Sequence, residues 1–161
     1  MAIPGLSTLG IEVGYAVVTS TASLPAAFTP LPRCNSADGI ELSTESIDAS
    51  ALEDYVTMRV AGRSDIPETW AMQFNSTPEA RTAVQGMITA YTTGLESNAD
   101  TLVCIEIYDP KDTTGAYFVF VQPPAMLGLS EISQNALKTF ELSCTLVKVH
   151  GYGTGVKPAA A

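Results

Sequence analysis

Apolar residues recur at every second position in several segments of the chain, which is the period of a β-strand with one buried face. In residues 9–18, Ile11, Val13, Tyr15 and Val17 alternate with smaller or polar residues. Further strands of this kind are predicted at residues 40–42, 56–60, 70–74, 102–107, 117–121 and 136–150. The pattern therefore predicts a mainly β chain.

Turn-forming residues between these segments predict two antiparallel hairpins. The stretch Gly62 to Pro67 separates the strand at 56–60 from the strand at 70–74, so we expect these two strands to pair. The sequence Asp109-Pro110-Lys111-Asp112 separates the strand at 102–107 from the strand at 117–121 in the same way.

Three of the predicted strands have clearly different faces, because successive side chains point to opposite sides of a sheet. The apolar faces, which we expect to be buried, carry Val56, Met58, Val60, Trp70, Met72, Phe74, Phe140, Leu142, Cys144 and Leu146. The opposite faces, which we expect to be exposed, carry Arg59, Ala71, Gln73, Thr139, Glu141, Ser143 and Thr145.

One segment has the period of an amphipathic helix. Thr77 can cap its start, Pro78 suits the first helical position, and Glu79 favours the positive end of the helix. The apolar residues that follow at helical spacing are Ala80, Ala83, Val84, Met87, Ile88 and Tyr91. These signals predict a helix over about residues 78–92, which Gly94 would end.

Two segments have no strand or helix pattern. Residues 19–37 contain Pro25, Pro30 and Pro32 among Ser, Thr and Ala, and are predicted to form a long loop that adds little to the core. Residues 151–161 are rich in Gly and Ala and are predicted to be a flexible tail. With no internal repeat, residues 1–161 are expected to form a single domain.

Composition points to association with other protein chains. The chain has 161 residues, of which 46% are apolar and only 16% are charged, against a usual charged share of about a quarter. A free monomer usually carries more surface charge for solubility. The net charge of -9 and the eight scattered basic residues argue against sequence-specific nucleic-acid binding and against binding to anionic membranes. The start of the sequence lacks the basic and apolar regions of a signal peptide, so synthesis in the cytoplasm is expected.

The sequence offers no convincing catalytic, cofactor or metal site. His150 is the single histidine, and the three cysteines have no C-x-x-C spacing. Residues 41–54 contain five carboxylates, but their spacing does not match an EF-hand, and a solvated acidic loop explains them. We therefore expect a protein that is not an enzyme and that uses no metal or cofactor.

The order of elements in the middle of the chain resembles a known family. Residues 39–48 (Gly-Ile-Glu-Leu-Ser-Thr-Glu-Ser-Ile-Asp) lead into the strand Glu68 to Asn75, then a helix, a strand pair and the long final strand. This order, over about residues 10–150, resembles the major tail tube proteins of lambda-like long-tailed phages, in which a Glu-Leu-Thr-Ala-Glu-Ser-type segment precedes the same elements. Some members carry an added immunoglobulin-like domain, for which this chain is too short.

The resemblance implies a β-sandwich or partly closed barrel with one flanking helix. It also implies six copies in a ring and stacked rings that form the hollow tail tube of a virion, assembled in the host cytoplasm. The implied partners are other copies of the chain, tail terminator and tail tip proteins, and the tape-measure protein and double-stranded DNA inside the lumen, with no membrane. The residues expected to face the lumen are Thr139, Glu141, Ser143, Thr145, Gln73 and Arg59. Those expected between rings are Pro25, Pro30, Pro32, Glu45 and Asp48.

Three other functions agree with parts of the same sequence. A tail terminator or completion protein would form one ring without polymerising, and a tube subunit of a contractile tail-like apparatus would share the fold. A β-barrel that binds a small molecule would be a closed monomer with an apolar cavity. Filament formation by the purified protein separates the first of these from a tube subunit.

Overall fold

The computed structural model describes residues 10–41, 43–53, 55–130 and 132–155. These residues form one helix and ten strands. The elements are β1 (Glu12–Val18), β2 (Thr29–Pro30), β3 (Cys34–Ala37), β4 (Ser43–Asp48), β5 (Arg59–Asp65), β6 (Thr69–Asn75), α1 (Pro78–Ser97), β7 (Leu102–Asp109), β8 (Asp112–Gln122), β9 (Gly128–Leu129) and β10 (Thr139–Gly155).

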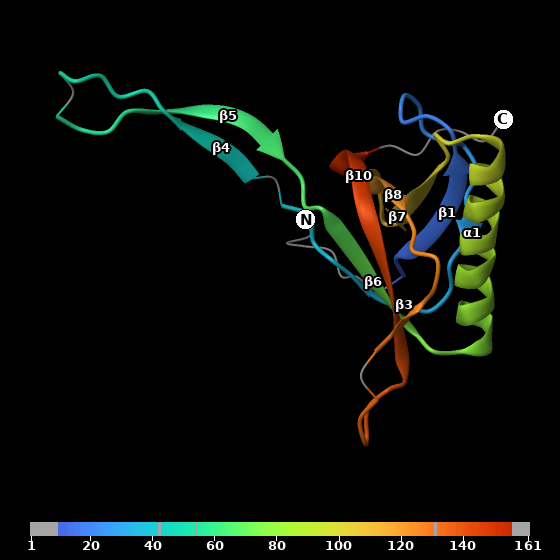
Figure 1. Cartoon of the computed structure of the whole chain (residues 1–161). Coiled ribbons are helices and arrows are strands. Elements are labelled where there is room, and N and C mark those ends of the chain that lie inside the picture. Colours follow the sequence, from blue (N-terminus) through green and yellow to red (C-terminus); the bar gives the residue numbers. More distant parts are fainter. Residues whose placement is uncertain (1–9, 42, 54, 131, 156–161) are drawn as a thin grey trace.

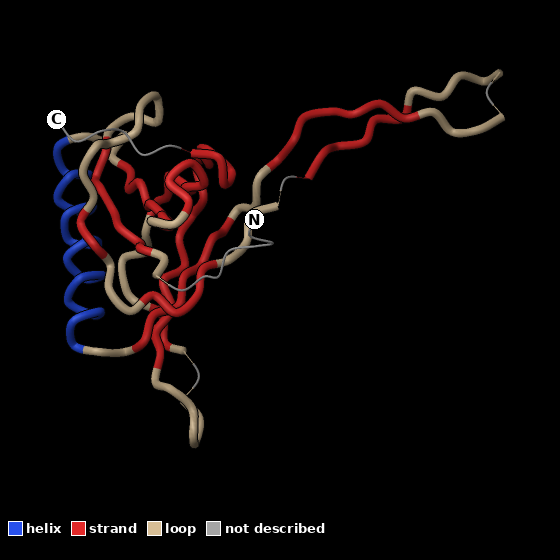
Figure 2. The backbone as a smooth tube through the Cα atoms, turned by 180° about the vertical axis from the view of Figure 1, so that it is seen from behind, coloured by secondary structure: helices blue, strands red, loops and turns tan. Residues whose placement is uncertain are grey.

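Eight of the strands form one curled antiparallel sheet, a half-barrel with α1 along one side (Figure 1, Figure 2). The strand order is β2-β1-β7-β8-β10-β6-β3, and β9 pairs with β10. The long strand β10 joins the two parts of the sheet, because residues 139–145 pair with β6 and residues 145–155 pair with β8. The predicted mainly β fold with one flanking helix is confirmed.

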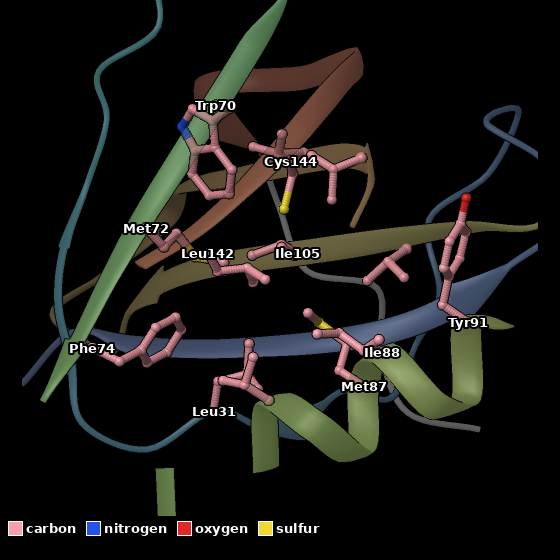
Figure 3. Close-up of a cluster of buried hydrophobic side chains, with 14 of the residues drawn as sticks. Leu31, Trp70, Met72, Phe74, Met87, Ile88, Tyr91, Ile105, Leu142 and Cys144 are labelled. Atoms are coloured by element: carbon pink, nitrogen blue, oxygen red, sulfur yellow. The ribbon is translucent and has the colours of Figure 1, made fainter. Parts of the chain in front are cut away.

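The main core lies between the concave face of the sheet and α1. Trp70, Met72 and Phe74 of β6 point into it as predicted, and so does the apolar face of β10. Figure 3 shows them pointing into the same interior as Met87 and Ile88 of α1. The rings of Phe74 and Phe140 stack there, with centroids 5.3 Å apart, within the range that favours aromatic pairs.

The predicted helix is confirmed, but its end is not at Gly94. Thr77 caps the start, since its side-chain oxygen accepts a hydrogen bond from the Ala80 amide, and Pro78 is the first helical residue. The helix continues to Ser97, where the Asn98 amide donates to the Gly94 carbonyl. Gly94 is needed for packing, because a Cβ there would lie 2.7 Å from Cγ2 of the buried Thr101.

A second, smaller core covers the opposite face of β7 and β8. Cys104, Phe118 and Phe120 are buried there under Leu24 and Phe28. The expectation that residues 19–37 form a loop with little part in the core is therefore wrong. The segment also contains β2 and β3, and its Leu31 lies in the main core with only 3% of its surface exposed. Its few apolar residues are widely spaced, so no periodic pattern marked them.

The predicted pairing of residues 56–60 with residues 70–74 is also wrong. β5 pairs with β4 in a separate two-stranded sheet, while β6 lies between β10 and β3. The ribbon of β4, β5 and their connection, residues 43–65, extends away from the body (Figure 1), and we call it the arm. The stretch 43–54, expected to be a polar loop, thus supplies one strand of it. The short strand expected at 40–42 is not formed at 40–41, and residue 42 lies outside the described residues.

The other sequence predictions for the second half of the chain are confirmed apart from the bounds of the final strand, which begins at Thr139 and not at residue 136. β7 and β8 form the expected hairpin, and β10 has the expected buried and exposed faces as far as Leu146. The predicted tail starts too early, because β10 continues to Gly155, which pairs with Ala116 of β8. Residues 156–161 lie outside the described residues.

Candidate assembly surfaces

A polar band lies on the outward face of β6 and β10, away from α1. Glu141, Ser143 and Thr145 are exposed on it and Thr139 is half-buried, all on the face predicted from their alternation with buried residues. Gln73 belongs to the same band because it pairs directly with Glu141, and its Nε2 donates to Thr139 Oγ1 at 3.2 Å. The structure thus brings five of the six predicted lumen residues together, with Glu141 as the charged group among them.

Arg59 does not belong to this band. It lies on β5 of the arm, where it is exposed and stands directly opposite Asp48 of β4. It was predicted to face the lumen from a strand paired with residues 70–74, and the structure does not have that pairing.

The arm has one polar face and one apolar face. Asp48 and Arg59 lie on the polar face, while Ile47 and Val60 oppose each other on the other face, with Met58 two residues along from Val60. These apolar side chains are largely exposed, with 51% of Val60 and 55% of Met58 accessible to solvent. The strand predicted at 56–60 is wrong in its bounds, because β5 begins at Arg59 and continues to Asp65, through the turn expected at 62–67. The apolar alternation marks a face that the isolated chain leaves open.

The tip of the arm is closed by local hydrogen bonds. Asp48 Oδ1 accepts from the Ser50 amide at 2.9 Å, and this bond together with the Ser50 side chain lowers the pKa of the Asp48 carboxyl. Ser50 Oγ also accepts from the Met58 amide at 2.7 Å. Beyond this ladder, Leu52, Tyr55 and Val56 are exposed. A hairpin with these residues on its surface has the features of an interaction element.

The five residues predicted to lie between rings fall into two separate groups. Glu45 and Asp48 are exposed on β4 of the arm. Pro25 and Pro32 are half-buried on the body, and Pro30 pairs with Gly14 at the edge of the sheet. The prolines therefore lie with the edge strand β2 and the cover of the second core, while the carboxylates extend away from them.

An apolar groove opens between β1 and β3, on the open side of the half-barrel. Its volume is about 640 Å³, and Val13, Trp70 and Val119 are among the residues that line it. The polar atom of Trp70 is already satisfied, because Nε1 donates to the Asp38 carbonyl at 2.8 Å. The groove offers size and apolar contact but no converging set of charged groups.

The thiols and the imidazole are placed for packing. Burial raises the pKa of Cys34 to about 11 and that of Cys144 to about 12. Burial, followed by the neighbouring carboxylate of Glu106, raises the pKa of Cys104 to about 12. A raised pKa keeps a thiol protonated and unreactive at neutral pH. His150 lies edge-on to the Phe118 ring, with centroids 6.2 Å apart.

The described part of the chain contains no cluster of three or more His, Cys, Asp or Glu side chains that could hold a metal ion. Within the same residues, no helix is long and apolar enough to cross a membrane.

Comparison of the structure with solved structures finds similar chains over nearly its whole length. A chain of the PVC sheath/tube terminator of an extracellular contractile injection system has a TM-score of 0.60 at 13% identity, covering 92% of this chain and 97% of that chain. A chain of the anti-feeding prophage (AFP) baseplate has a TM-score of 0.58 at 11% identity, covering 98% and 100%. The fold is the tail tube-like fold.

A third chain with this fold comes from the virion of a native gene transfer agent particle, with a TM-score of 0.53 at 10% identity, covering 90% of this chain and 97% of that chain. No protein-family model and no curated protein matches the sequence. The tail tube-like fold expected from the resemblance is confirmed. Because the sequence identities are this low, the structural similarity shows the fold alone.

Proposed function

We propose that this chain is a structural subunit of a phage tail or tail-like particle, in which six copies form a ring and the rings stack into a hollow tube. The observation that carries the proposal is the tail tube-like fold, matched over 90% or more of the chain by chains of tail-like assemblies. One of these was determined with six-fold symmetry, the AFP baseplate.

The uncovered surfaces of the single chain support self-assembly. The arm leaves Leu52, Tyr55 and Val56 exposed, and the segment between β9 and β10 exposes Ile132 and Leu137. Few soluble monomers display so many large apolar side chains on projecting segments. The sheet also ends in the short edge strands β2 and β3, whose outer backbone groups a neighbouring copy could pair with.

The polar band is our candidate for the wall of the lumen. Short uncharged groups with one carboxylate, Glu141, offer few attachment points to a passing polyanion, and the net charge of -9 per copy opposes adhesion of DNA. In this proposal the lumen holds the tape-measure protein and then double-stranded DNA. Terminator and tip proteins close the ends of the tail.

Glu141→Lys tests the lumen assignment in assembled tails. Six new cations per ring would attract the phosphates, so DNA ejection should slow, most strongly at low salt where screening is weak. The matched control is Glu96→Lys, the same charge change on an exposed residue of α1. Normal ejection by the Glu141→Lys tails at every salt concentration would show that the band lies elsewhere.

A second candidate function is a tail terminator or cap that forms a single ring. The likeness to a chain of the PVC sheath/tube terminator favours it. So does a chain of the AFP tube terminating cap, with a TM-score of 0.57 at 11% identity, covering 92% of this chain and 91% of that chain. Both functions use the same ring, and they differ in whether a second ring can bind on top.

Electron microscopy of the purified protein over a range of concentrations tests both functions. A tube subunit should give long hollow tubes with six-fold rotational averages, whereas a terminator should give single rings at every concentration. A species that stays monomeric at high concentration, with or without preformed tube ends as seeds, would contradict both proposals.

A further inference from the structure

Three basic residues gather at the end of the body where β6 passes into α1. The Asn75 amide donates to the Arg33 carbonyl at 2.9 Å, and the Ser76 amide donates to the Lys138 carbonyl at 2.8 Å. Arg81 lies in the first turn of α1, where its amide donates to the Thr77 carbonyl. Segments far apart in the sequence thus bring Arg33, Arg81 and Lys138 around one short connection.

All three of these side chains are exposed. They make up three of the eight Lys and Arg residues in the chain, and Glu79 in the same helical turn is the neighbouring carboxylate. The residue Glu131 lies outside the described residues. In a chain with a net charge of -9, this surface, which we call the basic end, is a local excess of positive charge.

The basic end also carries exposed apolar side chains. The chain between β9 and β10 projects from the body there, and it leads directly into Lys138 (Figure 1). Leu129 at the end of β9 is 85% exposed, and Leu137 on this segment is 71% exposed. An apolar surface edged by cations is therefore open at this end of the molecule.

The arm has the complementary features. It carries Glu45, Asp48 and Glu53 as exposed carboxylates, and Asp48 already faces Arg59. Beside them lies the exposed apolar face described above. The arm joins the body at the start of β6, whereas the basic end lies at the finish of β6, so the two surfaces are at opposite ends of that strand (Figure 2).

We propose that the arm of one copy binds the basic end of the next copy, head to tail. This contact rests on the proposed function, and it names the surface that receives the arm. The carboxylates of the arm would meet Arg33, Arg81 and Lys138, while the apolar face of the arm would cover Leu129 and Leu137. A contact between two different surfaces of the same chain is heterologous and can propagate into an open stack.

The charges also disfavour the symmetrical alternatives. Two arms placed together would bring carboxylates against carboxylates, and two basic ends would bring cations against cations. Like charges in contact oppose association, whereas opposite charges fix partner and register. The same reasoning makes the contact sensitive to salt, because these groups are exposed and screened within about 10 Å at 0.1 M salt.

Charge reversal on each surface tests the contact. The arm variant is Glu45→Lys/Glu53→Lys, and the end variant is Arg81→Glu/Lys138→Glu. Either variant alone replaces attraction by repulsion, so we expect a rise of at least about tenfold in the critical concentration for polymerisation, measured by sedimentation and electron microscopy. An equimolar mixture of the two should polymerise again, since each reversed surface then finds its complement.

Two controls separate the outcomes. Glu12→Lys/Glu96→Lys makes the same charge change as the arm variant on exposed residues outside both surfaces, and it should polymerise like the wild type. Circular dichroism and thermal unfolding of the monomers check that both reversed variants fold. If the wild type polymerises and the end variant does so equally well, the arm binds elsewhere, although the proposed function stands. A wild type that never polymerises overturns both.

Discussion

Two glycines in α1 should respond in opposite directions to the same substitution. Gly86 and Gly94 both lie inside the helix, where replacing Gly by Ala normally stabilises a protein by about 1 kcal/mol. A Cβ at Gly86 would meet nothing within 4 Å. A Cβ at Gly94 would lie 2.7 Å from Cγ2 and 3.3 Å from Oγ1 of Thr101.

Thr101 cannot move away easily. It is 1% exposed, and its hydroxyl donates to the Asn98 carbonyl at 2.7 Å, so rotation of the side chain would break that bond. Forcing an extra methyl group into such a site usually costs about 1–3 kcal/mol. Set against the helical gain, Gly94→Ala should be neutral to destabilising by about 2 kcal/mol, whereas Gly86→Ala should stabilise by up to about 1 kcal/mol.

Urea denaturation of the monomeric protein, followed by circular dichroism, measures both changes. For a chain of this size, 1 kcal/mol corresponds to about 2–4 °C in Tm, so thermal unfolding gives an independent reading. The double variant Gly94→Ala/Thr101→Ser removes the closest methyl group and should recover part of the loss. If Gly94→Ala stabilises the protein as much as Gly86→Ala does, the packing of Thr101 against the helix is not as described.

Two further predictions concern the start of the helix and the buried thiols. Thr77→Ala removes the helix cap and should lower the free energy of unfolding by about 0.5–2 kcal/mol. The control Thr93→Ala, at an exposed position of the same helix, should not lower the free energy of unfolding. Equal effects of the two substitutions would exclude a special role for the cap. The pKa of Cys144 is raised from 9.0 to about 12 by burial, so the folded state keeps a proton that the unfolded state loses, and stability present below pH 9 should be lost as the pH rises towards 12. Urea titrations at pH 8 to 11 measure how steeply the free energy of unfolding falls with pH. This fall should be less steep in Cys144→Ala than in the wild type, by up to about 1.4 kcal/mol per pH unit. Equal steepness in the two proteins would contradict the burial of that thiol.

The parts of the fold that followed from the sequence are those decided by local pattern. The two-faced strands β6 and β10 and the capped start of α1 carry their signals within a few residues, and their buried faces were assigned correctly. The polar band followed from the same alternation, because the residues between buried positions must point outward. Its grouping with Gln73 followed from the face assignment of β6.

The parts that failed depend on contacts between distant residues. The alternation within residues 59–65 does not determine their partner. They could pair with residues 43–48 or with β6, because either arrangement gives a regular strand. The second core was missed because Leu24 and Phe28 are isolated apolar residues in a segment rich in proline. Gly94 was predicted to end the helix because glycine commonly does so. Its actual role is to leave room for Thr101, seven residues later in the sequence.

The position of β10 in the sheet makes completion of the body wait for a strand that follows all the strands it joins. Chains emerge from the ribosome with the N-terminal part first, and β10 comes after β1 to β9 in the sequence. Until it is made, the group β2-β1-β7-β8 and the pair β6-β3 have no strand to join them. Trp70 and Phe74 therefore lack their partners on β10 until that strand has been synthesised. In the proposed assembly, a growing chain cannot offer a finished body to a neighbour before this point, so the order of synthesis would delay stacking.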